Sequence, residues 1–348
     1  MSEADRLDAL ARWLRAPLGA DEVRIDAAGA PALNGASNDT LMVRASWTTR
    51  GTASEGGFVV RRPPSGPSLY DTYDLAGQYA TMAALADTDV PVPSLVGYEP
   101  DDGVLGAPFY VMREVAGEAP PDLPPFTTVG WVLESSAEEQ ATLYAASIRM
   151  LGRIHRLDHT ALDLRHLAPG RGRSGFDDLL ARAEQWYRWA LEDRDNPVLE
   201  ATLTWLVEHR PAPAAEGLSW GDARVGNMLY RDLEPVVVLD WEMAAIGPAE
   251  VDLGWWLFLN RHHTDGLGVP PLPGFPDDAT TVAMWEDAAG RSASDVFYYD
   301  VFAGFRFGII VLRAARRMIE QGSLAEEQSF ERSNGATTLL QAMLDLPG

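Results

Sequence analysis

A run of polar residues between two short apolar stretches decides the fold of this chain. Residues 219–230 read SWGDARVGNMLY, and residues 236–242 read VVVLDWE. Two apolar runs joined by a short loop predict an antiparallel hairpin, in which we pair Tyr230 with Val237. The sequence therefore predicts a small hairpin that carries polar side chains at its open end.

Three of these polar side chains meet in that register. Asn227 faces Asp240 across the open end of the hairpin, and Asp222 arrives from the loop before it. Two carboxylates and an amide suit a hard divalent cation and a general base, because Mg²⁺ binds few protein oxygens and shares its shell with substrate phosphates. Each residue alone could instead be a loop cap or an Asx-turn. The Asp-x-x-x-x-Asn spacing together with a strand-end Asp favours phosphoryl transfer.

The composition of the 348 residues excludes several classes of function. The 28 basic residues are all Arg, the acidic residues number 51, and the formal net charge is −23. A nucleic-acid binder needs a basic footprint, so we expect no nucleic-acid partner. The absence of Lys excludes Schiff-base and P-loop lysine chemistry, and the absence of Cys excludes disulfides and thiolate nucleophiles. With no signal peptide or long apolar run in the sequence, we expect a cytoplasmic protein with no membrane partner.

Hydrophobic periodicity divides the chain into a sheet-based part and a helical part. Strands are predicted where β-branched and aromatic residues cluster, at 40–47, 58–61, 95–98 and 109–112. Helices are predicted where apolar residues recur every three or four positions, at 1–15, 74–86, 136–157, 176–209 and 295–319. We therefore expect an α+β protein with an N-terminal lobe over 1–112, a hinge linker over 113–116 and a mostly helical C-terminal lobe over 117–348.

Several short motifs resemble those of one known family. Besides the two stretches already quoted, they are GASN at 35–38, VPVP at 90–93, FYVM at 109–112 and GP…DL at 247–253. Together they resemble the aminoglycoside phosphotransferase and choline kinase-like family over most of the chain. The resemblance implies a protein-kinase-like fold of two lobes, and transfer of the γ-phosphate of ATP, with Mg²⁺, to a hydroxyl of a small molecule.

The resemblance also implies a role for each polar residue of the hairpin. Asp222 would be the catalytic base that accepts the hydroxyl proton, and Asn227 and Asp240 would hold Mg²⁺ against the ATP phosphates. Arg224 would place a cation near the transferred phosphate, where negative charge develops in the transition state. Its alternative role is an ordinary salt bridge. Asp252 is expected to brace the catalytic loop.

The implied nucleotide site departs from the family pattern at two positions. Arg61 stands where the family has a phosphate-contacting Lys, and Gln78 stands where its Glu partner is usual. Arg keeps the positive charge, and the Gln78 carbonyl can accept a hydrogen bond from it. The remaining predicted nucleotide-binding residues are the phosphate loop and the linker that pairs with adenine: Gly35, Ala36, Ser37, Asn38, Arg113 and Val115. The phosphate loop could also be an ordinary hairpin turn.

The sequence leaves two questions open. The replacements at Arg61 and Gln78, and Trp220 in place of the usual His of the catalytic loop, keep a second hypothesis alive, a nucleotide-binding module without catalytic activity. The acceptor could be an aminoglycoside, an amine alcohol, a sugar or a hydroxyacyl compound. We expect Trp255 to lie in the core and the adjacent His262 and His263 to be exposed; neither the oligomeric state nor the choice between ATP and GTP follows from the sequence.

Overall fold

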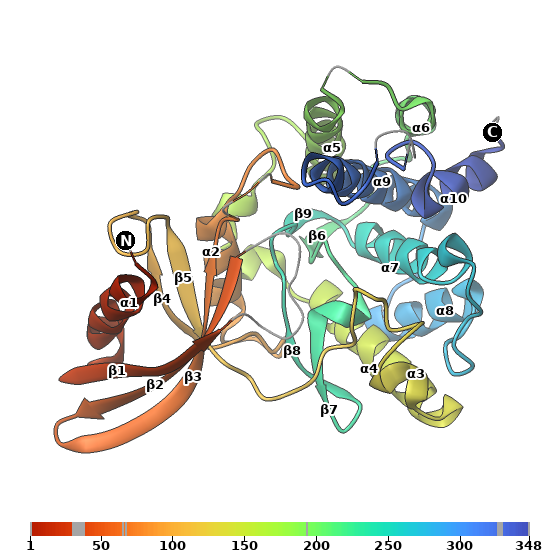
Figure 1. The fold of residues 1–348 in the computed structure, drawn as a ribbon. Coiled ribbons are helices and arrows are strands. Elements are labelled where there is room, and N and C mark those ends of the chain that lie inside the picture. The colour runs from red at the N-terminus through yellow and green to blue at the C-terminus, as the bar shows by residue number, and fades with distance from the viewer. Residues whose placement is uncertain are drawn as a thin grey trace.

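The computed structural model describes residues 2–29, 39–64, 66, 68–192, 194–325 and 330–346. Its N-terminal part is an antiparallel sheet in the order β1-β2-β3-β5-β4, with one helix on each face (Figure 1). The strands are β1 (Glu22–Gly29), β2 (Asp39–Thr49), β3 (Thr52–Arg62), β4 (Leu95–Glu99) and β5 (Phe109–Arg113), and the helices are α1 (Glu3–Leu18) and α2 (Leu75–Leu85). The predicted strands and helices are confirmed, and β1 is an additional strand that the sequence analysis missed.

The two faces of this sheet belong to different apolar cores. Side chains alternate between the faces of a strand, so Val60 and Val111 pack with α1 in a core of the N-terminal part. Their neighbours Val59 and Met112 join α2 in the main core, which continues into the helical part. The alternation thus connects β3 and β5 to the rest of the protein, and it fixes Arg61 on the opposite face from Val60.

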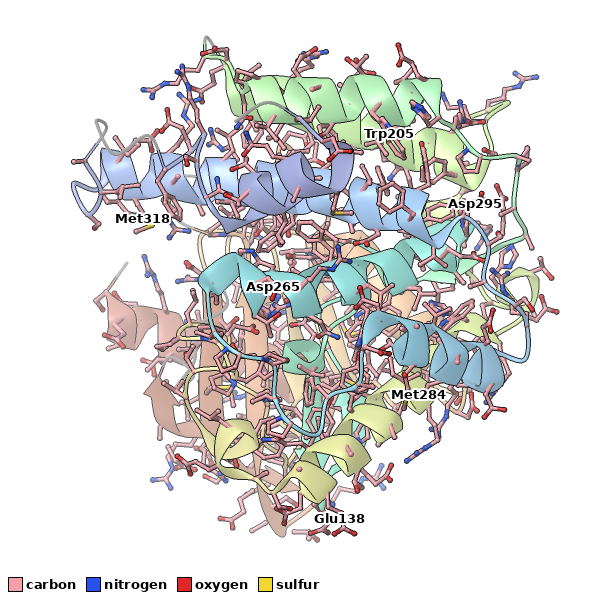
Figure 2. All side chains as sticks on the ribbon, turned by 90° about the vertical axis from the view of Figure 1, so that its right-hand side faces the viewer. Glu138, Trp205, Asp265, Met284, Asp295 and Met318 are labelled. Atoms are coloured by element: carbon pink, nitrogen blue, oxygen red, sulfur yellow. The ribbon has the colours of Figure 1, made fainter. Side chains whose placement is uncertain are left out.

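The remainder of the chain is mostly helical, and its helices lie in successive layers (Figure 2). The longer ones are α4 (Ala137–His155), α5 (Gly175–Leu191), α6 (Pro197–Glu208), α7 (Glu250–His262), α8 (Asp278–Ala289), α9 (Val296–Glu320) and α10 (Gly335–Leu344). The shorter ones are α3 (Trp131–Glu134), η1 (His159–Ala161), η2 (Arg165–Leu167), η3 (Val225–Asn227) and η4 (Asp265–Leu267). Packing of α7 against α9 forms the centre of this part. No helix among the described residues is both long enough and apolar enough to span a bilayer.

Local sequence signals start the helices that were predicted. The Ser136 hydroxyl accepts from the amide of Glu139, and the Glu139 carboxylate accepts from the amide of Ser136. This reciprocal pairing satisfies two amides that a helix start otherwise leaves free. In the same way the Asp74 carboxylate caps α2 through the amide of Gly77. Both helices begin where the sequence analysis placed them.

Two small sheets cross the helical part and carry the candidate site. They are β6 (Glu216–Ser219) with β9 (Ala245–Pro248), and β7 (Met228–Arg231) with β8 (Glu234–Val238). The hairpin β7–β8 forms as predicted, but its register differs by one residue: Leu229, not Tyr230, pairs with Val237.

The register shift has a local cause. The turn residues Asp232 and Leu233 both have positive φ, which makes a tight two-residue turn. Tyr230 then pairs with Pro235, and a bulge follows before the pairing of Leu229. As a result the amide of Leu239 donates to the carbonyl of Asn227 (2.8 Å), and the prediction that Asp240 lies directly opposite Asn227 is wrong by one residue.

Candidate active site

A buried carboxylate, that of Asp252 near the start of α7, holds the backbone just before Asp222. It accepts hydrogen bonds from the Ser219 hydroxyl (2.8 Å) and from the amides of Trp220 (2.6 Å) and Gly221 (2.7 Å). These groups lie between β6 and Asp222, so one side chain fixes the entry to the catalytic loop. The prediction that Asp252 braces this loop is confirmed.

A histidine completes the surroundings of Asp252. His155 at the end of α4 lies with Nε2 2.9 Å from the carboxylate, while its Nδ1 accepts from the indole N–H of Trp285 (2.8 Å). Because Nδ1 accepts a hydrogen bond, Nε2 must carry the hydrogen and donate it to Asp252. The carboxylate therefore accepts from four donors. Breaking any one of these hydrogen bonds would leave a buried polar group without a partner, which costs free energy.

The backbone at Gly221 admits only glycine. Its φ is +91°, and an added Cβ would lie 2.0 Å from the carbonyl oxygen of Met243. Glycine adopts this conformation without steric cost. Trp220, the residue that replaces the usual His, is fully buried, and its indole N–H donates to the carbonyl of Leu239 (2.8 Å). Its indole ring therefore fills the space beside the loop that leads to Asp222.

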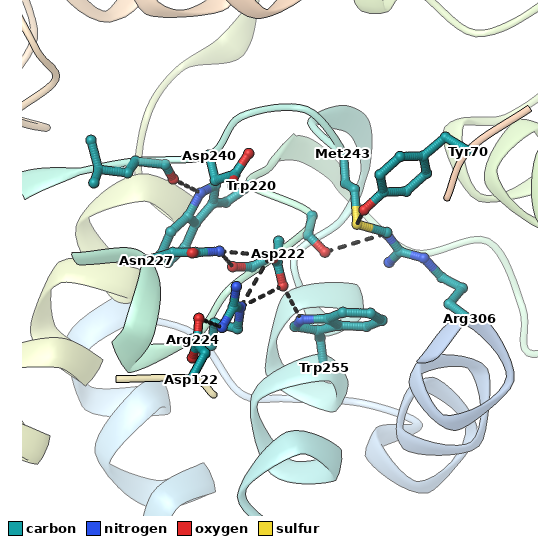
Figure 3. Close-up of polar contacts among 12 residues, drawn as sticks. Tyr70, Asp122, Trp220, Asp222, Arg224, Asn227, Asp240, Met243, Trp255 and Arg306 are labelled. Atoms are coloured by element: carbon teal, nitrogen blue, oxygen red, sulfur yellow. Dashed lines mark hydrogen bonds and ion pairs between the residues drawn. The ribbon is translucent and has the colours of Figure 1, made fainter. Parts of the chain in front are cut away.

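The carboxylate of Asp222 is only 8% exposed and is oriented by three side chains. Arg224 Nε donates to both of its oxygens (3.1 and 3.0 Å), Asn227 Nδ2 donates to Oδ2 (2.6 Å), and Trp255 Nε1 donates to Oδ1 (2.8 Å) (Figure 3). Each oxygen thereby accepts from two donors, one of which, Arg224 Nε, is shared between them, so the carboxylate is held in one orientation. This is the arrangement of a positioned proton acceptor.

Asn227, in η3, presents its two polar ends to different partners. Its Nδ2 donates both to the backbone carbonyl (3.0 Å) and to the side chain of Asp222. Both of these groups are acceptors, so the amide nitrogen must face them and the Oδ1 carbonyl points elsewhere. Asp240 follows β8 in the left-handed region, with φ +59°, a conformation that costs energy for a residue with a side chain. The strain indicates that the position of its carboxylate is over-determined by its surroundings.

Arg224 bridges two carboxylates. Besides the contacts of its Nε with Asp222, its Nη1 lies 2.5 Å from Oδ2 of Asp122. Asp122 belongs to the segment that follows the N-terminal sheet, and nothing in the sequence pattern marks it as part of the site. The salt-bridge role considered from the sequence is therefore present, and it keeps a guanidinium beside Asp222.

Arg61, predicted to contact phosphate, points at Asp240. Its Nη2 lies 3.3 Å from Oδ1 of Asp240, and both side chains are about 15% exposed. Burial lowers the pKa of Arg61, but Asp240, Tyr110 and Glu242 outweigh it and the net pKa lies above the usual value. The predicted hydrogen bond from Arg61 to the Gln78 carbonyl is replaced, since that carbonyl accepts from the hydroxyl of Tyr110 (3.3 Å). Tyr110 pairs with Arg61 across β3 and β5.

Two neighbouring carboxylates have raised pKa values. Burial, and then the charge of Asp222, raise the pKa of Asp240, with Arg61 acting in the opposite direction. Burial and the charge of Asp240 raise the pKa of Glu242 to about 8. The raised pKa values mean that the folded protein disfavours negative charge on both of these neighbouring carboxylates. A cation bound beside them would favour their charged forms.

The predicted adenine-binding linker begins at the end of β5. The amides of Arg113 and Glu114 donate to the carbonyls of Ser94 (2.8 Å) and Gly57 (3.0 Å). The amide of Val115, by contrast, has no backbone partner within the described residues. The guanidinium of Arg113 stacks on Phe58, 4.5 Å from the ring centroid, and on Trp47. The predicted phosphate loop, Gly35, Ala36, Ser37 and Asn38, lies outside the described residues.

Sequence reasoning missed the contact between Trp255 and Asp222. Trp255 was assigned to the core, and it is 1% exposed, but its indole N–H is one of the three donors on Asp222. A signal was available: Asp252 and Trp255 are three residues apart on α7, so they lie on one face of that helix. The face of α7 that braces residues 219–221 through Asp252 also reaches Asp222 through Trp255.

His262 and His263 are half-buried at the end of α7, and the expectation that they are exposed is wrong. The rings pack against Phe307 and Phe126, respectively. Burial lowers the pKa of His262 to about 4; burial, followed by His262 and Arg224, lowers the pKa of His263 to about 3. Neutral imidazoles are therefore the folded forms at neutral pH.

This burial predicts a loss of stability in acid. Unfolding frees each imidazole to bind a proton below its ordinary pKa of 6.5, so stability is full above pH 6.5 and falls as the pH is lowered towards 4. The shift of His262 corresponds to at most about 3 kcal/mol. We expect the double variant His262→Gln/His263→Gln to show a shallower decline of Tm over this range, measured by scanning calorimetry. Parallel Tm curves for variant and wild type would contradict the assignment.

Comparisons of the sequence with known proteins match one family model and several curated relatives. The model of the phosphotransferase enzyme family matches residues 29–290. Among curated proteins, the chain is 30% identical over 229 residues to acyl-CoA dehydrogenase family member 10 of Mus musculus and 28% identical over 224 residues to family member 11 of Homo sapiens. These matches cover 64% and 63% of this chain but 19% and 26% of the two relatives, so the chain corresponds to a minor part of each.

Solved structures share the fold over nearly the whole chain. A putative aminoglycoside phosphotransferase from Ralstonia eutropha has a TM-score of 0.70 at 23% identity, with 97% of each chain covered. Choline kinase LicA from Streptococcus pneumoniae has a TM-score of 0.57 at 12% identity, also with 97% of each chain covered. A thermostable mutant of aminoglycoside phosphotransferase APH(4)-Ia, in a ternary complex with ADP and hygromycin B, has a TM-score of 0.55 at 15% identity, with 97% and 99% covered. The predicted protein-kinase-like fold and the resemblance are confirmed.

Proposed function

Because the chain belongs to the phosphotransferase enzyme family, we propose that it is an ATP- and Mg²⁺-dependent kinase that transfers the γ-phosphate to a hydroxyl of a small molecule. The observation that carries this proposal is the geometry of Asp222, a buried carboxylate held by Arg224, Asn227 and Trp255. Such a carboxylate can accept a proton at a fixed point. Its neighbours supply the charges that phosphate chemistry requires.

In this reaction Asp222 accepts the proton of the acceptor hydroxyl as the hydroxyl oxygen attacks the γ-phosphorus. A new P–O bond forms, the bond to the bridging oxygen of the β-phosphate breaks, and ADP leaves with that electron pair. Arg224 would act on the developing charge, because its guanidinium lies beside Asp222, where the phosphoryl group would be transferred. Trp255 and Asn227 keep the base oriented throughout.

The donor set fits Mg²⁺. Asp240 provides a strained, buried carboxylate, and the Oδ1 carbonyl of Asn227 is left over once its Nδ2 has bound Asp222. No group of three or more His, Cys, Asp or Glu among the described residues could hold a metal unaided. This agrees with a site in which two protein oxygens are joined by phosphates and water. The ion would neutralise phosphate charge during transfer.

We assign the nucleotide to the side of the site where Arg61 meets Asp240. Arg61, already directed at Asp240, would share its charge with the phosphates, and Gln78 would hold Tyr110 beside it. The linker, proposed as 113–116 between lobes 1–112 and 117–348, would offer to adenine the amide of Val115, which has no backbone partner in the described part of the chain, and Arg113 would anchor its start. The loop Gly35–Asn38 would cover the phosphates, and a cytoplasmic location remains a prediction.

Titration of ATP with and without Mg²⁺ tests this proposal. We expect the wild type to bind ATP more tightly with Mg²⁺, and Asp240→Asn to lose that gain because the amide cannot replace the carboxylate as a metal ligand. Isothermal calorimetry measures both affinities. The matched control is Asp101→Asn, the same change at an exposed residue that is distant from Asp240 in the sequence. Absence of binding of both ATP and GTP to the wild type would overturn the proposal.

A second candidate function has one observation in its favour. The ion pair between Arg61 and Asp240 joins the proposed phosphate contact to a proposed metal ligand, as in a site that binds a nucleotide without turnover. A non-catalytic module of this kind would bind ATP but show no dependence of phosphate release on Asp222. The Asp222 variant therefore separates the two functions.

A further inference from the structure

Three arginines on α9 are buried, and they differ in their partners. Arg313 and Arg316, which are 7% and 8% exposed, both pair with Glu192 (3.0 and 2.5 Å). Arg306 is the most buried, at 4% exposure, and no carboxylate pairs with it within the described part of the chain. Its Nη2 donates to the carbonyl of Gly221 (3.3 Å), and its Nη1 is buried without a hydrogen-bond partner.

An unpaired guanidinium in such surroundings is expensive. The charge lies 4.8 Å from the ring centroid of Trp255 and 5.6 Å from that of Phe302, contacts that offset part of the cost of desolvation. Burial nevertheless lowers the pKa of Arg306. The charge of Asp252 acts on Arg306, but its carboxylate already accepts hydrogen bonds from four other donors. A buried charge without an opposite charge destabilises the protein, and binding of an anion would offset that cost.

The unpaired group lies in the candidate active site. Gly221, which Nη2 contacts, is the residue before Asp222, and Trp255, on whose ring the guanidinium lies, donates to Asp222. Asn227 binds Oδ2 of Asp222, whereas Trp255 binds Oδ1. In Figure 3 Arg306 accordingly lies on the other side of Asp222 from Asn227, beside Tyr70 and Met243. The nucleotide and metal are assigned to the Asn227 side, which leaves the Arg306 side for the acceptor.

We propose that Arg306 forms an anion subsite for the acceptor, and that the acceptor is a hydroxycarboxylate whose carboxylate binds Nη1 of Arg306 while its hydroxyl faces Asp222. This inference rests on the proposed function, because it names the substrate class of that site. A carboxylate fits better than a phosphate ester. The guanidinium of Arg306 already donates through Nη2 to Gly221, and one planar carboxylate is enough to accept from the N–H groups that remain. A polycationic acceptor is disfavoured by the same charge.

The side chains of Tyr70 and Met243 lie beside the guanidinium of Arg306 (Figure 3). Both are half-buried, and the hydroxyl of Tyr70 contacts Sδ of Met243 at 3.5 Å, a weak hydrogen bond. The two side chains come from different segments, one before α2 and the other after β8. An acceptor that reaches Nη1 would have to displace these two side chains, and their apolar parts would then face its carbon chain.

A binding experiment with matched probes tests the subsite. The probes are 3-hydroxybutyrate and 3-hydroxyhexanoate, their neutral amides, choline and glycerol phosphate, each titrated by calorimetry into wild type with and without Mg²⁺ and ADP. We expect the hydroxycarboxylates to bind most tightly. Arg306→Met should weaken them by about thirtyfold or more, because it removes one partner of a desolvated charge pair, and should leave the amides unchanged. Arg306→Lys should retain a preference for the carboxylate.

Controls separate this role from a structural one. If Arg306 only braces Gly221, Arg306→Met weakens carboxylates and amides equally, and the proposal is overturned. It is also overturned if no hydroxycarboxylate binds, or if choline or glycerol phosphate binds more tightly. Should Arg306→Met fail to fold, Arg306→Lys decides the question. If Arg306→Lys keeps the preference for carboxylates over amides, the proposal is supported; if it loses that preference, the proposal is overturned.

The two proposals can fail separately. Binding of Mg²⁺ and ATP with no preference for carboxylate would leave the kinase function standing and remove the subsite. A carboxylate preference that depends on Arg306, in a protein that binds neither ATP nor GTP, would keep the subsite and remove the kinase function.

Discussion

Asp222→Asn should lower phosphate transfer by roughly a hundredfold to ten-thousandfold, the range over which a positioned general base acts. The amide occupies the same volume but cannot take up the hydroxyl proton. Its contacts argue for a selective effect, since Asn227 remains anchored by the amide of Leu239 and Asp240 is untouched. We therefore expect the affinity for ATP with Mg²⁺ to change little. Phosphate release from ATP, with the hydroxycarboxylate panel as acceptors, measures turnover, and calorimetry measures affinity.

Asp122→Asn is the matched control for this prediction. It removes the second carboxylate from Arg224 but leaves the base and its contacts with Asn227 and Trp255. If the two variants reduced turnover equally, the charge of Arg224 rather than proton transfer would carry the effect. If Asp222→Asn kept nearly normal turnover, the kinase mechanism would be wrong, whereas slow phosphate release that ignores Asp222 would favour the non-catalytic module.

Local physics made the framework of this site predictable from the sequence. The alternation of side chains marked β3 and β5, capping residues marked the starts of α2 and α4, and apolar runs marked the hairpin. The polar residues Asp222 and Asn227 could be brought together because their spacing of five residues lies within one loop, and the structure shows them in contact at 2.6 Å. Interactions of short range are encoded by neighbouring residues.

What could not be predicted depends on distant parts of the chain or on turn geometry. The hairpin register depended on two positive φ values, at Asp232 and Leu233, that no residue type there demands. Asp122 contacts the catalytic loop from about 100 positions away in the sequence, and Arg306 from 85 positions away. The residues around Asp122 have an ordinary surface charge pattern, and Arg306 belongs to a largely apolar helix, so neither is marked as part of the site. Only the packing of α7 against α9 brings Arg306 to Gly221.

Asp252→Asn should destabilise the protein strongly, by about 3 kcal/mol or more. The substitution keeps the volume but turns an acceptor of four hydrogen bonds into a group whose nitrogen faces a donor. The amides of Trp220 and Gly221 cannot both find an acceptor, and His155 cannot reverse its tautomer because Nδ1 is bound to Trp285. Tm from scanning calorimetry measures the loss.

Ser219→Ala calibrates that loss, because it removes one hydrogen bond of the four and should cost about 1 kcal/mol. A Tm for Asp252→Asn equal to that of Ser219→Ala would refute the idea that the carboxylate acts as a single brace. The brace also predicts which function fails first. Asp252 holds the strand side of the loop before Asp222, while Asn227 and Asp240 are carried by the β7–β8 hairpin, so transfer should fall at temperatures where ATP still binds with Mg²⁺. Loss of both together would mean that the two halves of the site depend on one support.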